Sequence, residues 1–158
     1  MEKVPFTKSG LANLKSELNG LKKFQRPDII KAIQIAREHG DLSENAEYHA
    51  AKEKQSFIEG RITELENVLS RAEIIDLSKL DGKRITFGTK VTVYDENSDK
   101  EIIFSIVGPY EANLDKGLIS ISSPIARALL SKEKGSRVEV NTPSGLKNYE
   151  VLDINILN

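Results

Sequence analysis

The sequence predicts an α+β protein with two domains, an antiparallel coiled-coil hairpin followed by a small antiparallel β-sheet domain with one helix. Apolar residues recur every three or four positions through the first half, whereas they alternate with polar residues in short runs through the second. A chain of 158 residues is long enough for two small domains. We therefore expect the hairpin over residues 1–76, a linker over 77–83 and the sheet domain over 84–158.

The first helix is predicted from a heptad-like run of leucines that ends in a stutter. Its expected seam consists of Leu11, Leu14, Leu18, Leu21, Gln25, Ile29, Ala32 and Ala36. The two consecutive steps of four around Gln25 locally unwind a left-handed supercoil. Pro27 lies inside this stutter, and an internal proline removes a helical hydrogen bond. We therefore expect a kink or a short break near Phe24 to Arg26.

The second helix is predicted from a more regular seam. This seam consists of Tyr48, Ala51, Gln55, Ile58, Ile62, Leu65, Leu69 and Ala72. Between the two helices, Gly40 can adopt the left-handed conformation that closes a helix, and Asp41 can cap the next one. A turn this short makes the helices antiparallel. At roughly 30 residues each, they form an arm on the order of 45 Å long.

The second domain is predicted from short runs of strand-forming residues separated by turns. The expected strands cover residues 90–94, 101–107, 117–121, 137–140 and 148–154. One helix interrupts them, because Ser123 can serve as its N-cap and Pro124 as its first helical residue.

Charge and composition exclude several classes of protein. The chain has 23 basic and 24 acidic side chains, a net charge of −1, and no cysteine. This balance excludes a protein that coats nucleic acid unaided, and the lack of cysteine excludes disulfide frameworks and thiol catalysis. No apolar run approaches the ~20 residues of a membrane span, and the first residues contain no signal-peptide core. We expect a cytoplasmic protein that does not interact with membranes.

The densest polar cluster lies at the predicted turn, around residues 39–45. Asp41 and Glu44 have the spacing of a capping box, in which both side chains satisfy backbone N–H groups. The same carboxylates could also bind Mg²⁺, which is often held by one or two protein carboxylates together with substrate oxygens. Such a pair would form half of a site, completed by a metal site of another protein. The two interpretations are compatible, because a cap also fixes side-chain directions.

Basic and neutral side chains flank this acidic tip. Arg37 and Lys52 lie on opposite arms and could contact a phosphate backbone, although Arg37 could equally pair with Asp41 four residues later. His39 and His49 lack the i, i+4 spacing of a helical metal site, so we interpret them as solvated side chains.

In the second domain the candidate feature is the polar turn of Ser122, Ser123 and Pro124 before an apolar helix. It could be an edge that docks another protein, and helix capping explains it equally well. The domain has no histidine and no glycine-rich phosphate loop, which excludes a Ser/His/Asp arrangement and a phosphate cradle of that kind.

Two long motifs resemble the signatures of a known family. Residues 37–53 read Arg-Glu-His-Gly-Asp-Leu-Ser-Glu-Asn-Ala-Glu-Tyr-His-Ala-Ala-Lys-Glu, and they closely resemble the signature of the bacterial Gre transcript-cleavage factors. Residues 117–130 resemble the second signature of that family. The resemblance covers both domains in the family's order, and the variant is similar to the GreA type.

The resemblance implies a factor whose second domain, similar to the FKBP fold, binds RNA polymerase while the coiled coil enters the secondary channel. Asp41 and Glu44 match the tip carboxylates that help to hold a second Mg²⁺ of the polymerase. Arg37 and Lys52 match a basic patch that faces the RNA 3′ end, and any contact with DNA is indirect. The polymerase then hydrolyses its own backtracked RNA, so the factor itself is not an enzyme and has no small-molecule substrate. We expect a monomer.

The region of Ser122 to Pro124 matches a family region associated with docking on the polymerase, although serine replaces an acidic residue that some relatives carry there. Three other functions remain open. The first is a secondary-channel protein that inhibits the polymerase. The second is an FKBP-like prolyl isomerase or chaperone with a coiled-coil handle. The third is a structural adaptor whose tip has no function.

Overall fold

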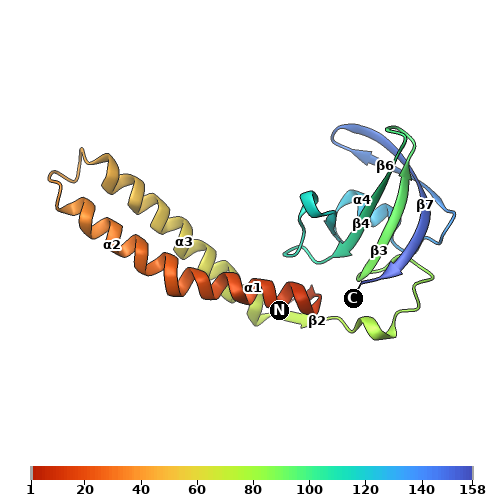
Figure 1. Cartoon of the computed structure of the whole chain (residues 1–158), viewed down its shortest axis with the longest axis horizontal. Coiled ribbons are helices and arrows are strands. Elements are labelled where there is room, and N and C mark those ends of the chain that lie inside the picture. Colours follow the sequence, from red (N-terminus) through yellow and green to blue (C-terminus); the bar gives the residue numbers. More distant parts are fainter. Residues whose placement is uncertain (1, 158) are drawn as a thin grey trace. The chain divides into compact units, whose positions relative to one another are not determined.

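The structure is a computed structural model that describes residues 2–157 (Figure 1). The chain forms two compact units, one of Leu11–Ala72 and one of Glu2–Gly10 together with residues 73–157. Residues 2–10 therefore belong to the second unit, whereas the prediction places them in the first domain, over residues 1–76. The reason is local pairing: strand β1 (Val4–Phe6) forms a two-stranded sheet with β2 (Ala72–Ile74).

The first unit is a helical hairpin, as predicted (Figure 1). Its helical segments are α1 (Lys8–Gly20), the π-helical turn η1 (Leu21–Gln25), α2 (Arg26–Arg37) and α3 (Ala46–Ser70). The first residues of α1, Lys8–Gly10, belong to the second unit, and α2 packs along α3. The repeated apolar seam accounts for this pairing, because each helix can bury its stripe only against the other.

Of the kink or short break predicted near Phe24 to Arg26, the break is wrong, and a π turn lies at this place. Gly20, Gln25 and Arg26 all keep right-handed helical backbone angles, so the helix continues through the proline. The Arg26 N–H donates to the carbonyl of Leu21, five residues back, which defines a π turn. Such a turn accommodates one additional residue and leaves the helix intact.

The buried seam also differs from the predicted one beyond this turn. The buried apolar residues are Leu14, Leu21, Ile29, Ile33 and Ala36 on the first arm, and Ile58, Ile62, Leu65 and Val68 on α3. Gln25 and Ala32 are exposed, and Ile33 takes the place predicted for Ala32. On α3, Val68 is buried while Leu69 is only half-buried.

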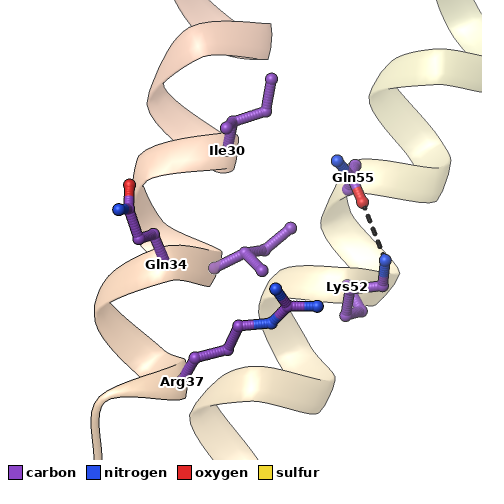
Figure 2. A pocket seen from close by; sticks show the side chains of 6 residues that line it. Ile30, Gln34, Arg37, Lys52 and Gln55 are labelled. Carbon is purple, nitrogen blue, oxygen red and sulfur yellow. Dashed lines mark hydrogen bonds between the residues drawn. The ribbon is translucent and has the colours of Figure 1, made fainter.

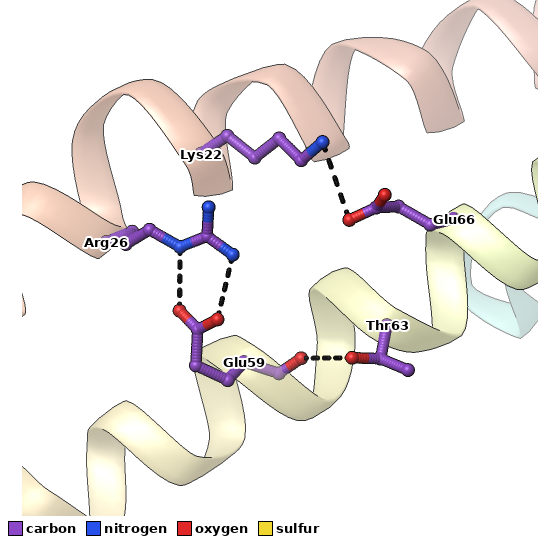
Figure 3. A network of polar contacts seen from close by, with 5 residues as sticks. All are labelled: Lys22, Arg26, Glu59, Thr63 and Glu66. Atoms are coloured by element: carbon purple, nitrogen blue, oxygen red, sulfur yellow. Dashed lines mark hydrogen bonds and ion pairs between the residues drawn. The ribbon is translucent and has the colours of Figure 1, made fainter.

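Ion pairs join the two arms along the middle of the hairpin (Figure 3). Arg26 donates from Nε and Nη2 to the two carboxylate oxygens of Glu59, each at 2.8 Å. Lys22 pairs with Glu66 at 3.4 Å, and Arg61 donates from Nε to Glu17 at 2.6 Å.

The second unit is built on a five-stranded sheet in the order β5-β4-β3-β7-β6. The strands are β3 (Thr89–Asp95), β4 (Lys100–Val107), β5 (Leu118–Ser120), β6 (Arg137–Thr142) and β7 (Gly145–Ile156). The pairs β3–β4, β3–β7 and β6–β7 are antiparallel, as predicted. Strand β5, however, is parallel to β4, so the sheet is not wholly antiparallel.

A crossover explains this parallel pair. Residues 108–117 return the chain to Ser105, in the second half of β4, through the 3₁₀ turn η3 (Leu114–Lys116), which ends at Gly117. Gly117 has φ +73°, and a side chain there would also collide with the carbonyl oxygen of Ile103. Only glycine fits where the two strands meet.

The sheet encloses the core of this unit against one short helix, α4 (Pro124–Leu129). The buried residues include Ile85, Val91, Val93, Phe104, Ile106, Ile119, Ala126, Leu129, Val138, Val140, Tyr149 and Val151. The predicted class, a helical hairpin followed by a small sheet domain with one helix, is confirmed. A further 3₁₀ turn, η2 (Leu77–Lys79), lies within the segment predicted as a linker. Among residues 2–157 we find no helix long and apolar enough to cross a membrane.

Candidate functional site

The turn between α2 and α3 forms the exposed tip of the hairpin. Helix α2 ends at Arg37, and the N–H of its C-cap residue, Glu38, still bonds to the carbonyl of Ile35 at 3.2 Å. Gly40 has φ +120°, a conformation that side chains disfavour, as predicted for the glycine that closes the helix. Residues 39–44 are exposed, so the polar side chains of the tip face solvent.

Asn45, not Asp41, caps the second helix, so the predicted capping box is wrong. The Asn45 side chain accepts a hydrogen bond from the Tyr48 N–H at 3.0 Å, and α3 begins at Ala46. Asn45 also donates from Nδ2 to the carbonyl of Ala36 at 2.6 Å. Since Asp41 lies five residues before the helix, its side chain is too early in the sequence to reach the first helical N–H groups.

Asp41 instead orders the turn itself. Its Oδ1 accepts from the Ser43 N–H at 3.0 Å and from the Ser43 hydroxyl at 2.9 Å. The backbone bond first, and the hydroxyl bond second, lower the pKa of the Asp41 carboxyl below its ordinary value. Asp41 is therefore ionised at neutral pH, and only one of its two oxygens accepts these bonds.

Asp41 and Glu44 line a shared surface hollow of about 430 Å³, together with His39, Asn45, Ala46 and Glu47. The structure thus brings the two predicted carboxylates to one place. Within residues 2–157, no three His, Cys, Asp or Glu side chains are grouped closely enough to hold a metal ion. Two carboxylates on an open surface fit a hard cation only as part of a ligand set, with the remaining oxygens coming from water or from another molecule.

The predicted basic residues line a neighbouring groove between the helices (Figure 2). Arg37 from α2 and Lys52 from α3 lie on opposite walls, with Ile30, Ile33, Gln34 and Gln55 completing the lining. The groove has a volume of about 380 Å³. Lys52 donates from Nζ to Gln55 at 3.2 Å, which holds its ammonium group along the groove. Two cations beside apolar and amide groups suit a phosphate-bearing chain.

Aromatic contacts hold the tip side of this groove. The Arg37 guanidinium carbon lies 5.9 Å from the centre of the Tyr48 ring, within the range of a cation–π contact. Tyr48 is half-buried and meets the His49 ring edge-on at 5.5 Å. The His49 ring nitrogen Nε2 is 3.2 Å from the Ser43 carbonyl, so His49 also supports the turn.

The polar turn of the second unit is a helix cap, as the sequence predicts. The Ser123 side chain accepts from the Ala126 N–H at 3.3 Å, and Pro124 occupies the first turn of α4. Ser122 is exposed, and its hydroxyl is 2.8 Å from that of Ser120. Capping leaves the outer side of Ser122 and Pro124 accessible.

Sequence reasoning missed two sets of residues at the site. Asn45 was not recognised as the cap, although asparagine is among the preferred N-cap residues and directly precedes the second seam. Gln34 and Gln55 were not recognised as groove residues. Gln34 lies one position after Ile33, which is buried in place of the predicted Ala32, whereas Gln55 belongs to the predicted seam of the second helix.

Comparisons with known proteins match both halves of the chain. The family model described as the N-terminal part of a transcription elongation factor, GreA_GreB_N, matches residues 4–74, and the GreA/GreB C-terminal model matches residues 80–156. The transcription elongation factor GreA of Ruegeria pomeroyi is 62% identical over 154 residues, which are 98% of either chain. That of Rhodospirillum rubrum is 58% identical over 151 residues, or 96% of either chain. The crystal structure of Gfh1, GreA factor homolog 1 of Thermus thermophilus, is 31% identical, covers 98% of this chain and 99% of its own, and has a TM-score of 0.45.

Proposed function

Since the chain belongs to the GreA/GreB family of transcription elongation factors, we propose that it binds RNA polymerase and stimulates the polymerase to cleave backtracked nascent RNA. The proposal depends above all on one observation. A single exposed turn presents the carboxylates of Asp41 and Glu44 beside a groove lined by Arg37 and Lys52. This combination suits a place where a metal ion and a phosphate chain are close together.

The hairpin can carry this tip into the secondary channel of the polymerase. Helix α3 alone has 25 residues, which corresponds to about 37 Å at 1.5 Å per residue. Its far end lies at an exposed turn, so the tip can enter a channel without unfolding the unit.

Asp41 and Glu44 are the residues of this chain that would hold Mg²⁺ at the polymerase active site. When bound there, the ion supplies water activation and neutralises charge on the phosphate. The chain's contribution is to fix the carboxylates in space. Ser43 does so by donating two hydrogen bonds to Asp41, and Asn45 does so by joining the end of α2 to the start of α3.

Arg37 and Lys52 orient the RNA. Their cationic groups lie on opposite walls of the groove, so they can contact successive phosphates near the 3′ end of the backtracked strand. Tyr48 and Gln55 limit the motion of these two side chains through the contacts described above.

The sheet unit supplies the docking surface. Ser122 and Pro124 lie at the start of α4 with their outer sides exposed, and we propose that this edge contacts the polymerase. The reacting groups belong to the polymerase and its RNA, so the factor acts as a monomeric stimulator in the cytoplasm and has no substrate of its own.

The proposal is tested with halted, backtracked polymerase complexes that carry 3′-labelled RNA. Adding the protein with Mg²⁺ is expected to release a short 3′ fragment and to restore elongation. The protein with Mg²⁺ and naked RNA is expected to leave the RNA intact. A slower polymerase without cleavage would overturn the proposal in favour of an inhibitor, and cutting of naked RNA would mean that the protein is itself a nuclease.

A further inference from the structure

The first arm of the hairpin contains a π turn where its sequence stutters. The turn covers Leu21–Gln25, and it is defined by the bond from the Arg26 N–H to the Leu21 carbonyl five residues back. π turns inside α-helices are rare and contain one residue more than an α turn. Pro27 follows the turn directly in a continuous helix, and it lacks the N–H that would donate to the carbonyl of Lys23, so the proline is compatible with a widened turn at this place.

Helical geometry gives a reason for the additional residue. The buried residues on either side of the turn, Leu21 and Ile29, are eight positions apart. In an unbroken α-helix eight steps overshoot two full turns by about 80°, which would place the two at opposite edges of the apolar stripe. If the turn absorbs one residue, seven effective steps fall only about 20° short of two turns. Both side chains then face α3, and both are 5% exposed.

The residue that the π turn absorbs also determines which side of α2 lines the groove. Arg26 is the first residue after the turn, and Ile30, Gln34 and Arg37 follow it at steps of four, four and three along one stripe of α2. Arg26 faces Glu59 of α3, while the other three line the groove opposite Lys52 and Gln55 (Figures 2 and 3). A rotation of α2 by one residue would turn this whole stripe away from α3.

We propose that the π turn is a phase-correcting insertion: its additional residue rotates α2 about the helix axis relative to the preceding part of the arm. The rotation places Arg37 opposite Lys52, while the base of the hairpin keeps its buried leucines. The turn is therefore a positioning segment for the groove. That the groove faces RNA rests on the proposed function, whereas the phase relation between the two halves of the arm does not.

Apolar burial, and not the ion pairs, sets this phase. The Arg26 and Glu59 side chains are 36% and 45% exposed, and ion pairs this exposed contribute little to stability. Ile29 and Ile33 are 5% and 9% exposed, and burial of such an apolar side chain contributes more to stability than an exposed ion pair does. Arg26 and Glu59 therefore follow the phase that the isoleucines fix.

Two matched single-residue deletions test the proposal. Lys23 lies in the π turn and Lys54 lies in the regular helix α3, and both are exposed. Deleting Lys23 should convert the π turn into an α turn and leave the phase on both sides unchanged. Helix α3 is regular at Lys54 and contains no additional residue there. Deleting Lys54 must therefore rotate the helix on one side of the deletion by about 100° relative to the other side.

The readout uses the full-length protein without polymerase. The chain contains no cysteine, so nitroxide labels attached at Gln34→Cys and Gln55→Cys report a single distance across the groove. We expect deletion of Lys23 to change this distance by less than about 2 Å and to leave the melting temperature unchanged or higher. Deletion of Lys54 is expected to move a surface label by about 8 Å, for a helix of roughly 10 Å diameter, or to unfold the hairpin.

Two results would overturn the proposal. One is a deletion of Lys23 that shifts the distance or lowers the melting temperature as much as deletion of Lys54 does. The other is a deletion of Lys54 that changes the distance and the melting temperature as little as deletion of Lys23 does. An unlabelled Lys23 deletion should also stimulate RNA cleavage as well as the parent protein. If neither protein stimulates cleavage while the distances behave as expected, the proposed function fails and the phase correction stands.

Discussion

The Asn45 side chain donates to the carbonyl of Ala36 at 2.6 Å while it caps α3 through the Tyr48 N–H. One residue therefore joins the end of α2 to the start of α3. The six exposed residues between them, 39–44, have few other attachments, so the position of the tip carboxylates depends on this link.

Replacing Asn45 separates its two roles. Asn45→Ala should lower the free energy of unfolding of the hairpin by about 2 kcal/mol, because it removes a helix cap and a second hydrogen bond. Asn45→Asp keeps an acceptor for the cap but loses the donor to Ala36, so about half of that loss is expected. Thermal unfolding followed by circular dichroism measures both, with the exposed helical Asn13→Ala as the control. Equal stability of Asn45→Ala and the parent would contradict the assigned link.

The Asp41 carboxyl should titrate below the ordinary aspartate range. Its pKa is lowered by the Ser43 N–H and hydroxyl, so the ionised form is favoured in the folded turn. Since the folded pKa lies below the unfolded value, the stabilisation is present above about pH 4 and is lost as the pH falls through the folded pKa. An NMR titration of the side-chain carbonyl carbon measures this pKa. Ser43→Ala should raise it, and an unchanged value in that variant would mean that the hydroxyl has no influence on the carboxyl.

The effect of Gly10→Ala on the free energy of unfolding should change sign when the Glu111 side chain is removed. Glu111 accepts from the Thr7 N–H at 2.9 Å and also from the Thr7 hydroxyl, and a Cβ on Gly10 would collide with this carboxylate. Gly10→Ala is therefore expected to destabilise the parent protein. In a Glu111→Ala background the collision is gone, and the same change should stabilise α1 by up to about 1 kcal/mol. A double-mutant cycle by chemical denaturation measures the coupling, and simple additivity would show that the two residues do not meet.

Arg61 should make the hairpin sensitive to salt. Its guanidinium donates to Glu17 on the first arm and to Glu64 on its own helix, and the bond to Glu17 contributes most to raising the pKa of Arg61. Arg61→Gln is expected to lower the melting temperature at low salt. The difference should shrink in 1 M NaCl, where the Debye length falls to about 3 Å. Lys31→Gln, on the exposed side of α2, serves as the control, and a difference that does not depend on salt would assign the effect of Arg61 to packing.

Much of the fold could be predicted because it depends on period alone. The seam from Ile58 to Leu65 fixes the second arm, and the position of Gly40 fixes the turn. The exact cap could not be predicted, because Asp41 and Asn45 are both good N-cap residues and only tertiary packing selects between them. The direction of β5 could not be predicted either, because the sequence of a strand of three residues does not indicate whether it pairs parallel or antiparallel to its neighbour.

The π turn marks the clearest limit of the sequence. A spacing of eight between Leu21 and Ile29 is compatible with a stutter in a coiled coil and with one absorbed residue. The two solutions bury Ala32 or Ile33, respectively. The larger side chain gains more by burial, and the structure buries Ile33.

The central claim is that the tip carboxylates act at the polymerase active site and not merely in the turn. The most direct measurement is the rate of RNA cleavage in backtracked complexes with Asp41→Asn and Glu44→Gln, at saturating protein and with polymerase binding measured in parallel. Asp41→Asn keeps an oxygen that can accept from Ser43, so the turn is preserved, and Glu47→Gln changes a third carboxylate of the same hollow as the control. We expect at least a tenfold loss of rate for the first two variants, roughly the cost of disturbing a metal site, with unchanged binding. Cleavage by both at the parent rate would contradict the central claim.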